Sequence, residues 1–242
     1  RAPITKSRLF HPHNGSMADA LRTPTILTRR PWREFVVETN NGIISTAGIV
    51  EGMVAAEVRN TTVVISAVIA LVVGTFTAAA ARYADAAYER DAAYSAVAEA
   101  QSRLLREPAM ELDDLTAIYQ DKGLSPALAE QVAQELTAQD AIGAHIEDEL
   151  ELEADDFASP WWPAGLSAVA FAVGGVLPLL LSIFIPTNDR LLTTGAAVAL
   201  ALAITSYTGA RIAQTPPTRV VLRTVAIGVA TLALAALVGS TF

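Results

Sequence analysis

The sequence predicts an all-α integral membrane protein with five transmembrane helices and a cytosolic helical domain inserted between helices 2 and 3. Three long apolar segments lie near the C-terminus, each close to the ~20 residues that a membrane-spanning helix needs. Charge is also divided unevenly. Residues 86–158 contain 18 acidic and four basic side chains, whereas the rest contains seven acidic and 13 basic ones. The acidic segment therefore forms a separate part of the chain.

Five segments are expected to span the membrane. The three C-terminal segments are clearly apolar, the second segment is rich in alanine and threonine, and the first is the least apolar of the five. In chain order they are residues 35–56, 61–81, 161–185, 191–213 and 220–242. The predicted organisation is a mobile tail (1–31), helices 1 and 2 (32–85), the acidic domain (86–158) and helices 3 to 5 (159–242).

The distribution of basic side chains predicts which side of the membrane each loop faces. They gather before the first span and around the link between spans 4 and 5, at Arg22, Arg29, Arg30, Arg33, Arg211 and Arg219. The loops on the opposite side have one arginine each, Arg59 and Arg190. The positive-inside rule then places the N-terminus and the acidic domain in the cytosol and the C-terminus outside.

The acidic segment predicts several helices. Span 2 continues without glycine or proline, so one helix of about 70 Å is expected over residues 61–106. A second helix covers 109–124 with a C-capping Gly123, a third starts at Ser125-Pro126, and a last one covers about 140–152. Such a charge run is usually a solvated surface. Dense carboxylates can also bind a hard cation, and the absence of cysteine leaves oxygen as the main ligand.

The first span carries polar groups at regular spacing. Steps of four and three residues place six of them on one stripe of a helix: Glu34, Glu38, Asn41, Ser45, Gly48 and Gly52. Charged groups in a span normally face the protein interior or water, so the stripe predicts a line of oxygen ligands along a cation path. For the small residues of the stripe, close helix contact is the better explanation. Glu51 lies off the stripe and is either an exit carboxylate or a solvated end residue.

Three stretches carry a resemblance to one family: NNGIISTAGIVEG (40–52), ELDDLTAIYQDKGLSPALAEQVAQELTAQDA (111–141) and PWWPAGLSAVAFAVGGVLPLLLSIFIP (160–186). Over residues 31–242 the chain resembles the vacuolar iron transporter family. The resemblance implies a homodimer of five-helix protomers that moves ferrous iron, and often manganese, out of the cytosol in exchange for protons. It also implies that the cytosolic domain gathers metal.

Several positions depart from the pattern that the resemblance implies for the membrane helices. The acid before the glycine of helix 1 is Asn41, and a second acid seven residues earlier matches Glu34. The metal-binding methionine of helix 2 is replaced by Ala78 and its glutamate by Arg82. An arginine there would repel a divalent cation unless it is paired, with Asp85 or Glu38 as the expected partners.

The cytosolic domain matches the family's metal site only in part. Two glutamates of its first helix correspond to Ala100 and Arg103, whereas those of its second helix correspond to Glu111 and Asp114. The last helix keeps Glu149, and His145 stands where the family can have a methionine. The expected metal ligands are Glu111, Asp114, His145 and Glu149.

The predicted function is therefore export of divalent metal, with a transport path of Glu34, Glu38, Asn41, Ser45 and Glu51. Fe2+ or Mn2+ is the transported ion, and no resident cofactor, nucleic acid or enzymatic activity is expected. The expected partners are the lipid bilayer and a second copy of the chain, and the expected location is a bacterial plasma membrane. The alternative is a non-transporting homologue that acts as a metal-binding sensor or structural membrane subunit.

Overall fold

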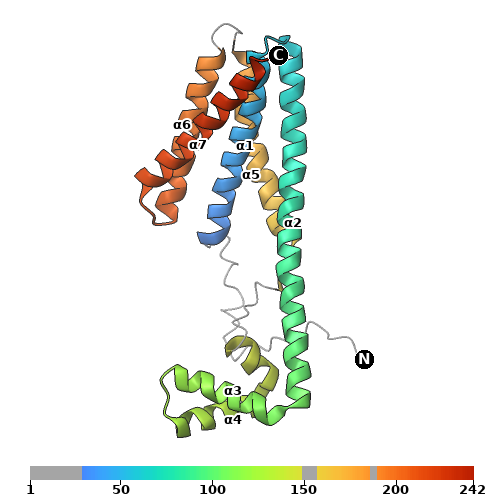
Figure 1. Ribbon diagram of the computed structural model, residues 1–242, viewed down its shortest axis with the longest axis vertical. Helices are drawn as coiled ribbons and strands as arrows, with labels where there is room; N and C mark the ends of the chain where they lie inside the picture. The colour runs from blue at the N-terminus through green and yellow to red at the C-terminus, as the bar shows by residue number, and fades with distance from the viewer. Residues whose placement is uncertain (1–28, 149–156, 186–189) are drawn as a thin grey trace, which may run out of the picture. The chain divides into compact units, whose positions relative to one another are not determined.

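The computed structural model describes residues 29–148, 157–185 and 190–242, and these residues contain helices but no strand. The predicted tail over residues 1–31 lies outside them, except that α1 already begins at residue 29. The described helices are shown in Figure 1: α1 (Arg29–Ala55), α2 (Asn60–Arg106), α3 (Pro108–Asp121), α4 (Pro126–Asp148), α5 (Trp161–Phe184), α6 (Arg190–Ile212) and α7 (Pro217–Gly239).

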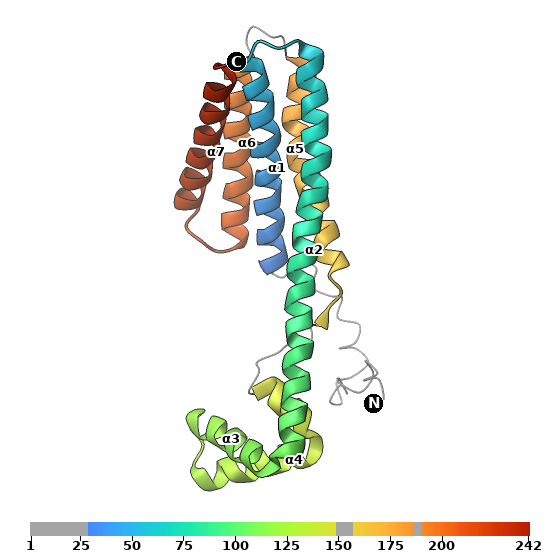
Figure 2. The same ribbon diagram turned by 45° about the vertical axis from the view of Figure 1, so that its right-hand side comes forward.

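The helices divide into two compact units, one including Asp85–Ser159 and the other Thr23–Ala84 with Pro160–Phe242. In the second unit α1 packs against α5, α6 and α7, as both views in Figures 1 and 2 show. The long helix predicted over residues 61–106 is confirmed, because α2 runs without interruption through Asn60–Arg106.

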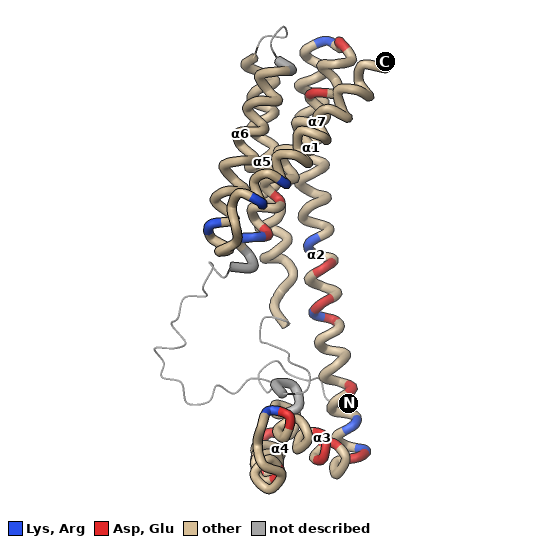
Figure 3. The backbone as a smooth tube through the Cα atoms, turned by 60° about the vertical axis from the view of Figure 1, so that its left-hand side comes forward, with Lys and Arg blue, Asp and Glu red and all other residues tan. Residues whose placement is uncertain are grey.

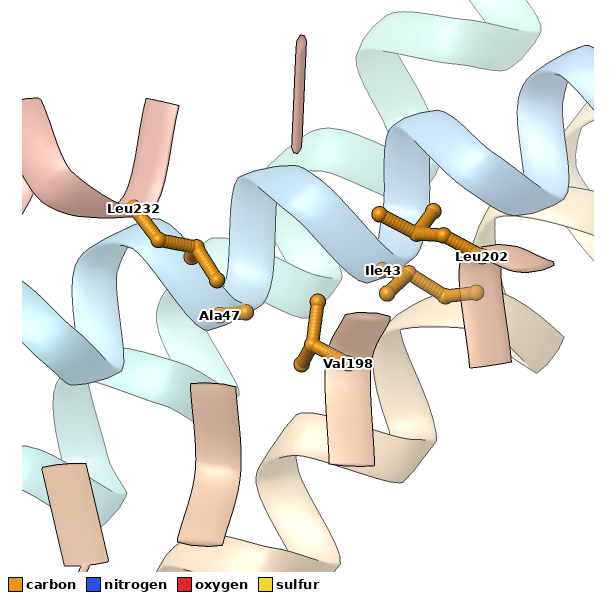
Figure 4. Close-up of a cluster of buried hydrophobic side chains, with 5 residues drawn as sticks. All are labelled: Ile43, Ala47, Val198, Leu202 and Leu232. Atoms are coloured by element: carbon orange, nitrogen blue, oxygen red, sulfur yellow. The ribbon is translucent and has the colours of Figure 1, made fainter. Parts of the chain in front are cut away.

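A cluster of aliphatic side chains holds the second unit together. Ile43 and Ala47 of α1 meet Val198 and Leu202 of α6, and Leu232 of α7 completes the cluster (Figure 4). All five side chains are at most 7% exposed. In a lipid bilayer such a contact stabilises helix association by van der Waals packing, because lipid tails are as apolar as these side chains. The interlocking of these side chains sets the register of α1 against α6.

Four described helices are long and apolar enough to cross a membrane: α2, α5, the Leu192–Ile212 part of α6, and α7. These correspond to four of the five predicted spans. The 27-residue helix α1 is not among them, because its polar groups lower its hydropathy. Its membrane crossing therefore stays a prediction.

The first unit contains the acidic helices. Leu115, Ala133 and Ala144 form its small buried core between α3 and α4. The predicted glycine cap is confirmed: Gly123 has φ +98°, its N–H donates to Gln120 O, and the next N–H donates to Tyr119 O. Helix α4 contains a non-helical residue at Asp140, the predicted start of the last helix. Figure 3 shows many acidic positions along α3 and α4, in contrast to the mostly uncharged bundle helices.

Candidate functional site

Helix α1 touches α5 through bare backbone. A Cβ added at Gly42 would lie 2.1 Å from the carbonyl oxygen of Phe171, and one added at Gly174 would lie 2.0 Å from that of Thr39. Only glycine permits this approach. Gly42 is not one of the stripe residues for which close helix contact was predicted. Of the two stripe glycines, the prediction is confirmed for Gly52, where a Cβ would lie 3.2 Å from a backbone oxygen of α7, whereas a Cβ at Gly48 would make an ordinary contact of 3.9 Å.

The part of the polar stripe that holds Asn41 and Ser45 lies on the outer side of the bundle, whereas the Gly52 end of the stripe packs against α7. Asn41 and Ser45 are exposed, as are the apolar side chains of Val37 and Ile49 beside them. The described residues therefore do not enclose a path along this stripe. An enclosed path would need further protein, such as a second chain, to cover Asn41 and Ser45.

Two acidic groups begin this stripe. Glu34 accepts a hydrogen bond from Arg82 of α2, with 2.9 Å between guanidinium nitrogen and carboxylate oxygen. Both side chains are roughly three-quarters buried, so the pair is only partly screened by solvent. Glu38 accepts a long, weak hydrogen bond of 3.5 Å from the Asn41 amide. Glu34, Glu38 and Asn41 lie together on one face of α1, and Arg82 pairs with Glu34, which was not one of its two expected partners.

Asn40, which was not among the predicted site residues, is the buried one of the two adjacent asparagines. It is 8% exposed. Its amide nitrogen donates to the hydroxyl of Ser206 at 3.4 Å, and its amide oxygen accepts from Thr205 at 2.5 Å. The NN dipeptide was the only signal, and it did not reveal which asparagine faces inward.

Glu51 does not join the stripe. Its side chain is 2% exposed, so the expectation of a solvated end residue is wrong. Within the described part of the chain, neither of its carboxylate oxygens has a hydrogen-bond partner. It lies on the face of α1 that meets other bundle helices, away from Asn41 and Ser45.

The expected metal ligands of the acidic unit are only partly visible. Glu111 is 4% exposed and accepts a hydrogen bond of 2.9 Å from Arg103, whereas Asp114 is exposed. The side chain of His145 and the whole of Glu149 lie outside the described residues. The described residues contain no group of three or more acidic, histidine or cysteine side chains placed to hold a metal ion.

Comparisons with known proteins support the resemblance in the sequence. The chain is 30% identical over 178 residues to a vacuolar iron transporter of Acanthamoeba castellanii, which covers 74% of this chain and 64% of that protein. It is 25% identical over 171 residues to vacuolar iron transporter 2 of Oryza sativa, covering 70% of each chain. It is also 33% identical over 73 residues to vacuolar iron transporter homolog 2 of Arabidopsis thaliana, covering 30% of this chain and 37% of that protein.

The matched region thus spans less than two thirds of the Acanthamoeba relative. A family model described as the VIT family matches residues 32–240, which include α1 to α7 almost completely. The chain therefore belongs to the VIT family.

Proposed function

We propose that the chain carries divalent metal ions, ferrous iron first and manganese second, out of the cytosol in exchange for protons. The family membership and the names of its relatives support metal transport. These relatives are named as transporters, which agrees with the prediction that the chain is not an enzyme.

The observation that carries the proposal is the line of oxygen-bearing groups on α1. Glu34 and Glu38 offer carboxylates, Asn41 an amide oxygen and Ser45 a hydroxyl. Hard divalent cations prefer such oxygen ligands. The metal would pass along this line.

A second protomer is proposed to cover the line. Exposed Asn41 and Ser45 would otherwise face lipid, which is unfavourable for polar groups in a membrane-spanning helix. A homodimer with its two α1 helices facing each other would enclose the path and offer both sets of oxygens to one ion. The bilayer would surround the remaining apolar surface of the bundle, which includes exposed Ile69, Phe76 and Leu234.

The acidic unit is proposed to collect the ion in the cytosol through Glu111, Asp114, His145 and Glu149. The N-terminus would be cytosolic and the C-terminus outside, and a bacterial plasma membrane is the proposed location. Arg103 and a bound metal ion would compete for the Glu111 carboxylate, since Arg103 donates a hydrogen bond to it. Metal binding there would have to displace or tolerate this arginine.

Transport is tested by uptake of Fe2+ into proteoliposomes that contain the full chain. Glu38→Gln keeps the size of the side chain but removes a charge from the line, so it should slow uptake about tenfold, which corresponds to about 1.4 kcal/mol in the barrier. Glu89→Gln, on the α2 portion in the acidic unit, is the matched control and should transport normally. Equal uptake by the wild type and Glu38→Gln would rule out the path.

A metal-binding sensor or structural membrane subunit is the second candidate. Two arginines favour it, because Arg82 pairs with Glu34 and Arg103 pairs with Glu111. Each places a fixed cation against a carboxylate that the transport proposal assigns to metal. Calorimetry with Mn2+ on the full protein, together with flux, separates the candidates: binding without flux supports the sensor.

A further inference from the structure

Glu51 is the one carboxylate of the bundle's interior for which the described residues offer no hydrogen-bond donor. It sits one turn before the end of α1, with 2% of its side chain exposed. Both of its carboxylate oxygens are buried and without a hydrogen-bond partner in the described part of the chain. An ionised carboxylate in this position is strongly unfavourable, and such groups are neutralised by a proton, a cation or a basic side chain.

The register of α1 and α6 shows which residue lies opposite Glu51. The helices are antiparallel: Asn40 bonds to Ser206, and one turn further along α1 the side chain of Ile43 packs beside Leu202, one turn back along α6 (Figure 4). The next turn brings Ala47 to Val198 in the same cluster. Continuing by one turn on each helix brings Glu51 to the level of Thr194.

Thr194 has an available hydroxyl. Its side chain is fully buried, and its Oγ1 has no hydrogen-bond partner among the described residues. Threonines in these helices usually donate to the carbonyl one turn earlier, as Thr75, Thr205 and Thr231 do. The Thr194 hydroxyl makes no such bond, so it is free to pair with a group across the helix interface.

Other charged groups of the packed helices lie far from this level, with one exception. Helix α5 contains no ionisable side chain. The ionisable residues at the opposite end of the bundle are Arg33, Glu34 and Glu38 of α1, Arg82 of α2, Tyr207 and Arg211 of α6, and Arg219 and Arg223 of α7. The exception within these helices is Arg190 at the first position of α6, one turn before Thr194; its side chain, like the whole of Asp189, lies outside the described residues. Glu57 and Arg59 of the loop after α1 also lie at this end of the bundle, and both are exposed.

We propose that Glu51 and Thr194 form a proton-binding site inside the protomer. The Glu51 carboxylate takes up one proton and becomes a neutral carboxylic acid. No hydrogen bond joins the two side chains in the structure, so in the proposed protonated state the Glu51 side chain turns to donate its O–H to Thr194 Oγ1. Release of that proton restores the carboxylate. A divalent cation is a poorer occupant, because Ca2+ and Mg2+ take about six or more oxygen ligands, whereas the described side chains of α1 and α6 offer one carboxylate and one unpaired hydroxyl at this level.

The site is separate from the polar stripe of α1. Asn41 and Ser45 lie on the exposed side of the helix, whereas Glu51 is buried against its neighbours. If the chain transports metal as proposed above, the two ions would use different faces of one helix, and Glu51 would carry the returning proton. Only this coupling role rests on the proposed function; the proton site itself does not.

Infrared spectroscopy of the full chain in lipid bilayers tests the site directly. Near neutral pH an ordinary glutamate, with a pKa of about 4.3, is ionised. We expect wild-type protein to show a carboxylic-acid C=O band under these conditions, with a shift in D2O. Glu51→Gln should abolish the band, and Thr194→Val should move it to higher frequency by removing the hydrogen-bond partner.

Controls separate a proton from other occupants. Glu57→Gln changes an exposed carboxylate in the following loop and should leave the band unchanged. Arg190→Gln should also leave it unchanged. No band in wild type, a band that persists in Glu51→Gln, or a band that vanishes when Na+ replaces a large organic cation would each overturn the proposal. If Glu51→Gln does not fold, the wild-type and Thr194→Val spectra still decide.

Flux measurements then distinguish the two proposals. A Glu51 band in a protein that moves no metal supports the proton site and contradicts transport. Metal uptake with no Glu51 band does the reverse. If the wild type shows both the Glu51 band and metal uptake, Glu51→Gln should move Fe2+ without the change in internal pH that accompanies uptake by the wild type. An unchanged pH response in this variant would contradict the coupling role.

Discussion

Arg103 Nε donates to Glu111 Oε1 at 2.9 Å, and this contact joins the end of α2 to the first turn of α3. Glu111 is almost fully buried, while Arg103 is about one third exposed. The guanidinium thus supplies a positive charge to a carboxylate that the family resemblance assigns to metal. The stability of the acidic unit is served when Glu111 binds Arg103, whereas a metal site requires the Glu111 carboxylate to bind the ion instead.

Replacing this arginine by an acid should favour metal. Arg103→Glu removes the competing cation and adds a third carboxylate near Glu111 and Asp114, so Mn2+ should bind the full protein at least about tenfold more tightly, or about 1.4 kcal/mol. Isothermal titration calorimetry measures the affinity. Arg103→Lys keeps the positive charge and should show no gain. Equal affinities for these two variants would contradict an antagonism between Arg103 and metal.

Close contact between α1 and α5 predicts a large difference between two glycine substitutions. Gly42→Ala would place a methyl group against the backbone of Phe171 and should lower the free energy of unfolding by about 3 kcal/mol or more. Gly165→Ala, in α5, meets no atom within 4 Å and should be neutral or stabilising by up to about 1 kcal/mol. Thermal unfolding in detergent compares them. Similar melting temperatures would mean that the two helices do not meet at Gly42.

The sequence predicted helix positions better than it predicted which way the helices face. Pro108, Gly123 and Pro126 act locally, so the helix ends near them could be expected from the chain alone. The burial of Glu51 depends on α6 and α7, which are far away in sequence. Neighbouring residues on a helix point about 100° apart, so the position of the packed surface decides whether a polar group is buried.

The candidate site, too, could be predicted from the sequence only where it depends on local helical spacing. The stripe from Glu34 to Ser45 follows from helical spacing, and the structure keeps Glu34, Glu38 and Asn41 close together. The pairing of Glu34 with Arg82 joins residues 48 positions apart, so no local pattern could have indicated it. Long-range contacts of this kind require knowledge of how α1 and α2 are placed within the bundle.

Asn40 and Asn41 provide a matched pair of adjacent amides. Asn40→Ala removes the partner of two α6 hydroxyls and should lower the free energy of unfolding by about 1–3 kcal/mol. Asn41→Ala changes an exposed side chain and should leave stability within about 0.5 kcal/mol while reducing metal flux. Melting temperature and Fe2+ uptake are measured on both. A destabilised Asn41→Ala with normal flux would reverse these assignments.

The ion pair between Arg82 and Glu34 predicts a gain of function. Arg82→Gln removes a fixed positive charge from the beginning of the proposed path and releases Glu34 to bind the cation. Electrostatic repulsion of a divalent ion at this position would then decrease, and Fe2+ uptake should rise about threefold to tenfold, more strongly at low ionic strength because salt screens charges.

Arg90→Gln is the control for this gain, because Arg90 lies two turns further along α2 and its pairing is with the adjacent Asp91. Uptake by that variant should match the wild type. If Arg82→Gln instead abolishes uptake while the protein stays folded, Arg82 positions Glu34 for transport rather than opposing the ion. Glu34→Gln in the same background then separates the two roles: under the repulsion hypothesis it should cancel the gain, because the released carboxylate would no longer be available to the cation.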